Sequence, residues 1–103
     1  MAKALVTVVH PTQRVDDSAA TLADIQGWRV EMKAKAATNW SPLGGARLPA
    51  ETTATADNLT TGTYDFRAIW TDKDGQDSAP AETEYVVGPP AKLKAGAISV
   101  SPA

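Results

Sequence analysis

Apolar and polar residues alternate most clearly along residues 64–71. A period of two is the pattern of a strand with one buried face. A hairpin signal, Asp-Lys-Asp-Gly, follows at residues 72–75. The pattern therefore predicts a strand with two different faces, and Ile69 and its polar neighbours lie on the face away from the core. The side chains that it directs into a core are Tyr64, Phe66, Ala68 and Trp70.

A second alternating stretch places Trp28, Val30 and Met32 on one side, with charged residues between them. It predicts another half-buried strand with these three side chains inward. Val8 belongs to a run rich in β-branched residues over residues 4–9, which predicts a strand that ends at the following proline.

Weaker signals predict the remaining elements. Residues 52–57 have the strand propensity of their threonines but little apolar mass, so we expect a mostly solvated strand. Residues 39–43 predict a short edge strand, because their proline cannot donate to a ladder. Residues 82–87 predict the strand that returns after the hairpin, and a helical turn is expected near residues 18–22. Short strands separated by turns predict an all-β fold, an antiparallel β-sandwich.

Length and charge limit the possible functions. The 103 residues predict one domain over residues 1–88 and an extended C-terminal tail over residues 89–103. A net charge of −2, with both signs scattered along the chain, lacks the basic stripe of a nucleic-acid binder. No apolar run is long enough to predict a membrane span, and the first ten residues lack the pattern of a signal peptide. We therefore expect neither a nucleic acid nor a membrane as partner.

The chain offers little for catalysis. It has no cysteine, which excludes disulfides, thiolate catalysis and cysteine-ligated zinc. His10 has no serine in an elbow motif as partner, and the adjacent Asp16 and Asp17 would point to different sides. Residues 72–77 resemble the opening of a calcium loop, but Thr83 stands where that loop needs a bidentate glutamate. We therefore expect no enzyme activity, no cofactor and no metal.

Three blocks of the sequence resemble the fibronectin type III family. Residues 24–31, DIQGWRVE, are similar to the Ile-x-Gly-Tyr-x-Val pattern of the family's third strand, with Trp28 at the tyrosine position. Residues 59–70 are similar to the Leu-x-x-Gly-Thr-Tyr-x-Phe pattern of the sixth strand, which makes Tyr64 the corner tyrosine that hydrogen-bonds the preceding turn. Residues 74–80 are similar to the Gly-x-x-Ser-x-Pro link before the last strand. The resemblance implies a β-sandwich used mainly for adhesion or structure.

The chain departs from bacterial and phage members of that family at its second strand. Those members usually read Trp-x-x-Pro-Thr there, and Val8 stands where the core tryptophan is expected. The sixth strand usually has alanine where this chain has Trp70. We hypothesise that Trp70 supplies, from across the core, the bulk that is absent at Val8.

A second departure concerns the sandwich as a whole. If residues 4–9 are the second strand, the domain lacks its own first strand, and an unpaired edge favours pairing with another strand. The candidate strand is the tail segment 96–102. Three interpretations stay open: a free terminus, a strand that folds back on its own domain, or a strand that binds a partner. The tail residues expected to contact a partner are Lys92, Lys94, Ile98 and Val100.

Trp40 is the side chain with the clearest possible role at the surface. An exposed tryptophan can stack on a sugar ring or anchor a protein contact. The competing interpretation is that it covers the edge of the core beside Leu43 and Leu48.

The resemblance and the missing export signal together favour one setting. They imply a structural protein of a bacteriophage particle, made in the host cytoplasm, that decorates a capsid or joins tail parts. Its expected partners are other virion proteins and further copies of itself. The alternative is a carbohydrate-binding or spacer module of a larger bacterial surface protein or hydrolase, with Trp28 and Trp40 as sugar platforms.

Overall fold

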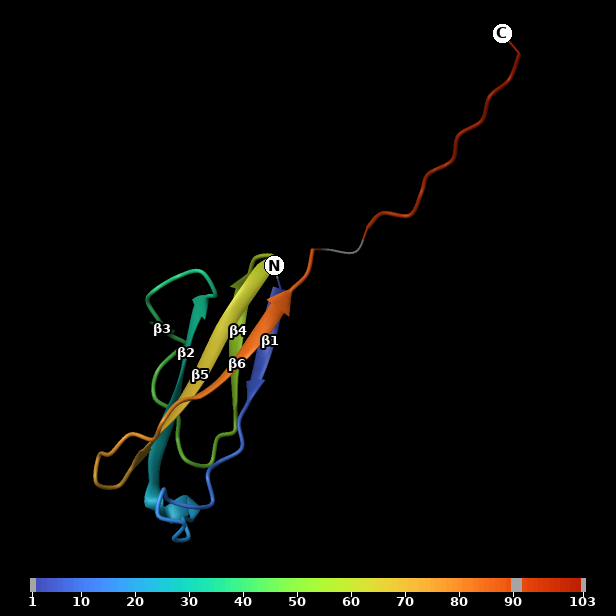
Figure 1. Ribbon diagram of the computed structural model, residues 1–103. Helices are drawn as coiled ribbons and strands as arrows, with labels where there is room; N and C mark the ends of the chain where they lie inside the picture. The colour runs from blue at the N-terminus through green and yellow to red at the C-terminus, as the bar shows by residue number, and fades with distance from the viewer. Residues whose placement is uncertain (1, 90–91, 103) are drawn as a thin grey trace.

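The chain forms strands where its sequence alternates, and the strands assemble into two antiparallel sheets. The computed structural model describes residues 2–89 and 92–102; the predicted domain's Met1 and the predicted tail's Pro90, Ala91 and Ala103 lie outside the described residues. The elements in chain order are β1 (Ala2–Thr7), the 3-10 helix η1 (Leu22–Asp24), β2 (Ile25–Ala34), β3 (Ser41–Pro42), β4 (Thr53–Leu59), β5 (Gly62–Asp72) and β6 (Ala81–Val87) (Figure 1).

The two sheets differ in size. β1 pairs with β4 alone, whereas the other sheet has the order β3-β2-β5-β6. All of these pairings are antiparallel. The prediction of an all-β, antiparallel fold is therefore confirmed, as is a short edge strand at Pro42.

One hydrophobic core joins the sheets, because a single cluster of buried side chains draws on both of them. Trp28 of β2 is the largest side chain in it, at 1% exposed, and its indole Nε1 donates to the backbone oxygen of Glu51 over 2.9 Å. The two-stranded sheet contributes mainly small side chains to this cluster, so large and small residues from the two layers fill one space. The cluster consists of Ala4, Val8, Trp28, Val30, Ala54, Ala56, Leu59, Phe66, Ala68 and Val87.

The structure adds burial and local detail to the sequence predictions. Most positions of β4 are exposed, as expected, but Ala54 and Ala56 are buried against the other sheet. Ile69 is buried, although it lies on the face of β5 opposite the core cluster. The helical turn lies at Leu22–Asp24, after the predicted residues 18–22, where the Asp24 carboxylate accepts the Thr21 N–H over 2.8 Å.

Candidate docking site on the open side of the sandwich

β1 presents an unpaired edge. Val8 continues the ladder with β4, since its N–H donates to the oxygen of Thr52 over 2.8 Å. Hydrogen-bonded and non-hydrogen-bonded positions alternate in an antiparallel pair, so the N–H and C=O groups of Leu5 and Thr7 point away from β4. Within residues 2–89 and 92–102, no strand pairs with these backbone groups. This edge therefore has the backbone groups that an added strand needs.

β6 lies across from that edge, and its inner face is largely uncovered. Thr83 is paired with Phe66, and Tyr85 with Tyr64, so these side chains share the core-facing side of the sheet. Tyr85 nevertheless remains 44% exposed, although its ring meets Phe66 edge to face with centroids 6.5 Å apart. Among the β6 side chains, only Val87 is buried. The core-facing side of β6 is therefore left largely uncovered by the described residues.

A cavity of about 240 Å³ occupies the space between β1 and β6. Figure 1 shows these two strands side by side along one flank of the molecule. We call this cavity the open groove; its apolar lining comes from both sheets and includes Val6, Val8, Val30, Phe66, Ala68 and Trp70, with Thr83 and Glu82 on the β6 side. The groove thus combines exposed apolar surface with a free strand edge.

Trp70 lies where the open groove meets the loop end of the sandwich. It is partly buried, packs against the core cluster and lines the open groove together with Val8. Its indole Nε1 donates to Nδ1 of His10 over 3.0 Å. This position agrees with the hypothesis that Trp70 fills space next to Val8, although the groove beside them is not full.

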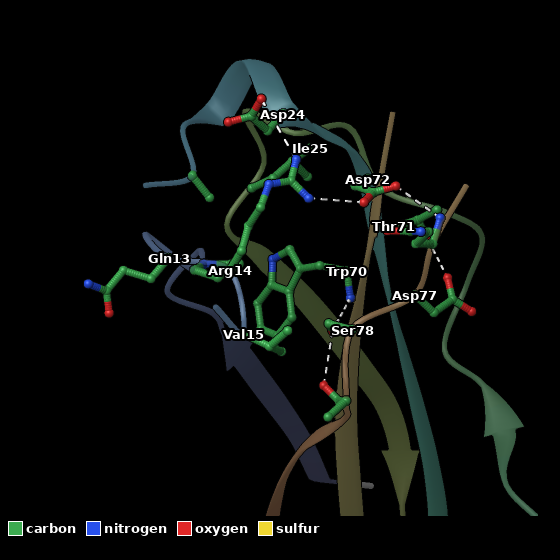
Figure 2. A pocket seen from close by; sticks show the side chains of 14 residues that line it. Gln13, Arg14, Val15, Asp24, Ile25, Trp70, Thr71, Asp72, Asp77 and Ser78 are labelled. Carbon is green, nitrogen blue, oxygen red and sulfur yellow. Dashed lines mark hydrogen bonds and ion pairs between the residues drawn. The ribbon is translucent and has the colours of Figure 1, made fainter. Parts of the chain in front are cut away.

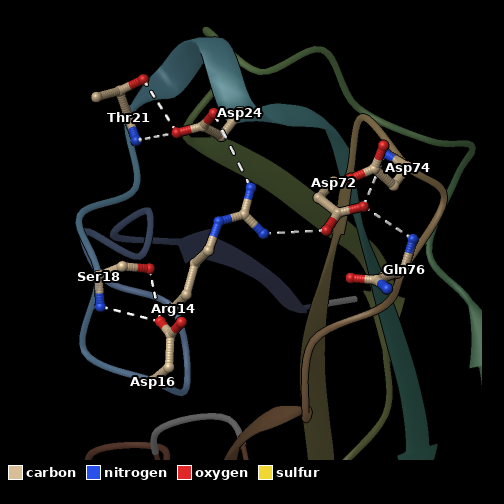
Figure 3. Close-up of polar contacts among 8 residues, drawn as sticks. All are labelled: Arg14, Asp16, Ser18, Thr21, Asp24, Asp72, Asp74 and Gln76. Carbon is tan, nitrogen blue, oxygen red and sulfur yellow. Dashed lines mark hydrogen bonds and ion pairs between the residues drawn. The ribbon is translucent and has the colours of Figure 1, made fainter.

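A second cavity, of about 250 Å³, lies at the loop end (Figure 2). Arg14 reaches into it and pairs with Asp72, Nη1 to Oδ2 at 3.2 Å, and with Asp24, Nη2 to Oδ1 at 3.9 Å (Figure 3). Because two carboxylates already balance the guanidinium, the cavity has no free cation to attract an anionic ligand. The ion pairs of Arg14 therefore link the loop after β1 to the hairpin between β5 and β6.

The two carboxylates that pair with Arg14, those of Asp24 and Asp72, also accept backbone N–H groups in turns. The backbone N–H of Gln76 donates to Asp72, and with Arg14 nearby this lowers the pKa of Asp72. The backbone N–H of Thr21 lowers the pKa of Asp24 in the same way. Residues 72–76 therefore form a carboxylate-capped turn, and within the described part of the chain no group of three or more His, Cys, Asp or Glu side chains could hold a metal ion.

Trp40 lies on the outer face of the larger sheet, away from the open groove. The Arg67 guanidinium stacks 4.3 Å from its ring centroid, and the Lys33 ammonium lies at 5.3 Å. Of the two leucines in the competing interpretation, Leu43 packs against the core and Leu48 is 68% exposed. A cation already occupies one face of the Trp40 ring, which reduces its use as a sugar platform.

Trp28 was treated as a sugar platform only in the carbohydrate-binding alternative, and its alternation predicted an inward side chain. It is buried in the core and hydrogen-bonded through its only polar atom, so no ligand reaches it. Two aromatic side chains of β5 also belong to the core. Phe66 is buried, and Tyr64 packs against the core while its hydroxyl donates to the backbone oxygen of Thr60 over 2.9 Å.

The described part of the tail, residues 92–102, does not pair with any strand of the sandwich. Residues 92–102 have no regular secondary structure, and Figure 1 shows them running away from the end of β6. Lys92, Lys94, Ile98 and Val100 are all exposed there. The structure does not bring them to the open groove, so their role in binding stays a prediction.

Sequence reasoning missed two inward-facing side chains of β6, of which Thr83 lines the open groove. Thr83 and Tyr85 belong to a strand of mixed polarity, and their inward orientation follows only from the register with Phe66 and Tyr64. The signal that could have identified them is the alternation of β5, once β6 is aligned with it.

No protein-family model matches the chain, and no curated protein matches it either. In the part of the chain that is described, no helix has the length and apolar character needed to cross a membrane.

Proposed function

We propose that the chain is an interaction module that binds protein partners by accepting a strand at the open groove. The observation that carries this proposal is the unpaired edge of β1 beside the uncovered inner face of β6. An added strand satisfies the backbone groups of Leu5 and Thr7 and places alternate side chains against Trp70 and Phe66.

The strand arrangement supports a fibronectin type III-like sandwich in which no strand of the described residues takes the first position. In sandwiches of the immunoglobulin type, the second and fifth strands share one sheet, and the third, sixth and seventh share the other. β1 with β4, and β2 with β5 and β6, fit this arrangement when β1 is taken as the second strand. The Tyr64 to Thr60 hydrogen bond supports the same assignment.

The proposed setting is the bacteriophage particle, where the module decorates a capsid or joins tail parts. It rests on the resemblance of the three sequence blocks, and symmetry of the particle would multiply a weak contact at each open groove. The reading frames that flank the coding sequence test this setting. Capsid or tail genes would support it, whereas a glycoside hydrolase in the same reading frame would favour a carbohydrate-linked module.

A peptide titration tests the docking function itself. The probe is a generic amphipathic strand, Lys-Thr-Val-Thr-Val-Thr-Lys, and its control has the same residues with both valines adjacent. The receptor is the full chain carrying Ile98→Asp and Val100→Asp, so that its own tail does not compete. We expect the alternating peptide to change the tryptophan fluorescence saturably and the control to leave it unchanged, since Trp70 lines the groove.

A blocked groove provides the matched receptor control. Thr83→Arg places a long side chain over the groove from an exposed position of β6, so the fold is retained. Binding of the alternating peptide should be lost in this variant. If the peptide binds neither receptor, the proposed docking function is wrong.

A further inference from the structure

The tail contains a segment that alternates in the way a docked strand requires. Ile98 and Val100 are separated by Ser99 and followed by Ser101, so one side is apolar and the other polar. Ile98 and Val100 are both more than nine-tenths exposed. As a strand, residues 96–102 span roughly 23 Å, close to the roughly 20 Å of the six-residue β1.

Charge also matches the tail to the sandwich. Residues 92–102 carry Lys92 and Lys94 and no carboxylate, a charge of +2, while the whole chain carries −2. The rest of the chain therefore carries −4, while the two charged residues that line the open groove, Arg67 and Glu82, balance each other. Attraction between the two parts favours docking of the tail.

We propose that the strand accepted by the open groove is residues 96–102 of a second copy of this chain. This inference rests on the proposed docking function. Ile98 and Val100 point into the groove toward Trp70 and Phe66, and the backbone pairs with Leu5 and Thr7.

The direction of the chain favours a second copy over the same molecule. The tail leaves β6 at the end where β1 begins, and it runs outward, giving the molecule a long axis of 82 Å against 27 and 24 Å (Figure 1). Pro89 has no N–H to donate, which opposes a tight hairpin back along β6. A tail that turned straight back would run parallel to β1, whereas a tail from another copy enters from the opposite end and forms the more stable antiparallel ladder.

Self-association of the full chain is the first measurement. We expect the molar mass from light scattering to rise with concentration. Ile98→Asp with Val100→Asp should weaken this association roughly tenfold or more, because charge replaces two buried apolar side chains. The matched control, Ser99→Asp with Ser101→Asp, changes the opposite face by the same charge and should weaken it much less.

Cross-linking separates the possible occupants, since the chain has no cysteine of its own. A tagged Ile98→Cys chain is mixed with a Thr83→Cys chain and treated with a short bismaleimide that bridges the roughly 10 Å between packed sheets. We expect a linked heterodimer, and far less of it when Ser99→Cys replaces Ile98→Cys.

Two outcomes would overturn the proposal. The double variant Thr83→Cys/Ile98→Cys closing within a monomer, with no link between copies, would show that the tail folds back on its own sandwich. No link in either arrangement would show that the tail does not occupy the groove. If the generic alternating peptide still binds in those cases, only this inference fails and the docking function stands.

Discussion

The indole N–H of Trp70 donates to Nδ1 of His10 over 3.0 Å and so ties β5 to the loop that follows β1. The imidazole of His10 also meets two tryptophans edge to face, Trp70 at 6.4 Å and Trp28 at 6.3 Å between centroids. The position of His10, between the end of a strand and a proline, predicts by itself only a corner residue. The contact gives it a second role, because it provides the polar partner that a partly buried indole requires.

Replacing Trp70 tests whether it supplies core volume. Trp70→Ala should destabilise the fold by about 2–3 kcal/mol, below the range for a fully buried tryptophan because part of the ring is accessible. Trp40→Ala is the control and should cost about 1 kcal/mol or less, since its ring lies on the outer face under Arg67. Urea denaturation measures both. Equal stability of wild type and Trp70→Ala would refute the hypothesis that Trp70 replaces the bulk missing at Val8.

The corner hydrogen bond of Tyr64 can be removed without changing the ring. Tyr64→Phe should lower the free energy of unfolding by about 1 kcal/mol, because the backbone oxygen of Thr60 loses its donor. Thr60→Ala keeps that oxygen and removes only the side-chain contact at 3.0 Å, so it should cost less. The reverse order of the two variants in thermal denaturation would argue against a structural corner.

Gly27 is required by a close approach of two backbones. A Cβ at this position would lie 2.6 Å from the backbone oxygen of Arg47. That oxygen accepts the N–H of Trp28 over 3.2 Å, so Gly27→Ala should separate the segments and cost about 1–3 kcal/mol. Gly45→Ala is the control, since a Cβ there meets nothing within 4 Å. Similar melting temperatures for the two variants would contradict this explanation.

Acid should loosen the loop end of the sandwich. The pKa of Asp72 is lowered by the Gln76 N–H and Arg14, and that of Asp24 by the Thr21 N–H. A lowered folded-state pKa stabilises the fold above the ordinary carboxyl pKa of about 4, and this stability is lost as the pH falls through the lowered values. Urea midpoints should therefore fall from pH 6 to pH 2.5.

A variant identifies the carboxylate responsible. Asp72→Asn should be less stable than wild type at pH 6, and the difference should shrink as the pH falls through the lowered pKa of Asp72, because wild-type Asp72 then loses its charge as well. Asp74→Asn is the matched control, because Asp74 enters this turn through its backbone N–H. A pH-independent difference for Asp72→Asn would show that its charge is not the cause.

The positions of the strands were predictable from sequence, but burial was predictable only for the strands that alternate strongly. Trp28 and Val30 have charged neighbours on both sides, so their inward orientation follows from the period of two. Ala54 and Ala56 carry little apolar mass, and only the large side chains facing them across the core explain their burial. Ile69 shows the same dependence on tertiary packing, since nothing in its local pattern distinguishes it from an exposed position.

The open groove was predictable in part. The alignment of residues 4–9 with a second strand led us to expect an unpaired edge, and among the described residues β1 pairs with β4 alone. The exposed inner face of β6 was not visible in the sequence, because Thr83 and Tyr85 gain their orientation from the register with β5. The surroundings of Trp40 were not visible in the sequence for a related reason, since the cations beside its ring come from β2 and β5.

Amide hydrogen exchange at β1, measured residue by residue by NMR, tests the central claim most directly. The N–H groups of Val6 and Val8 face β4 and should be protected at every protein concentration. Those of Leu5 and Thr7 face the open edge, so they should exchange quickly in dilute full-length protein and become protected when the chain associates or when the alternating peptide is added. Rapid exchange at Leu5 and Thr7 under all of these conditions would contradict strand docking at the open groove.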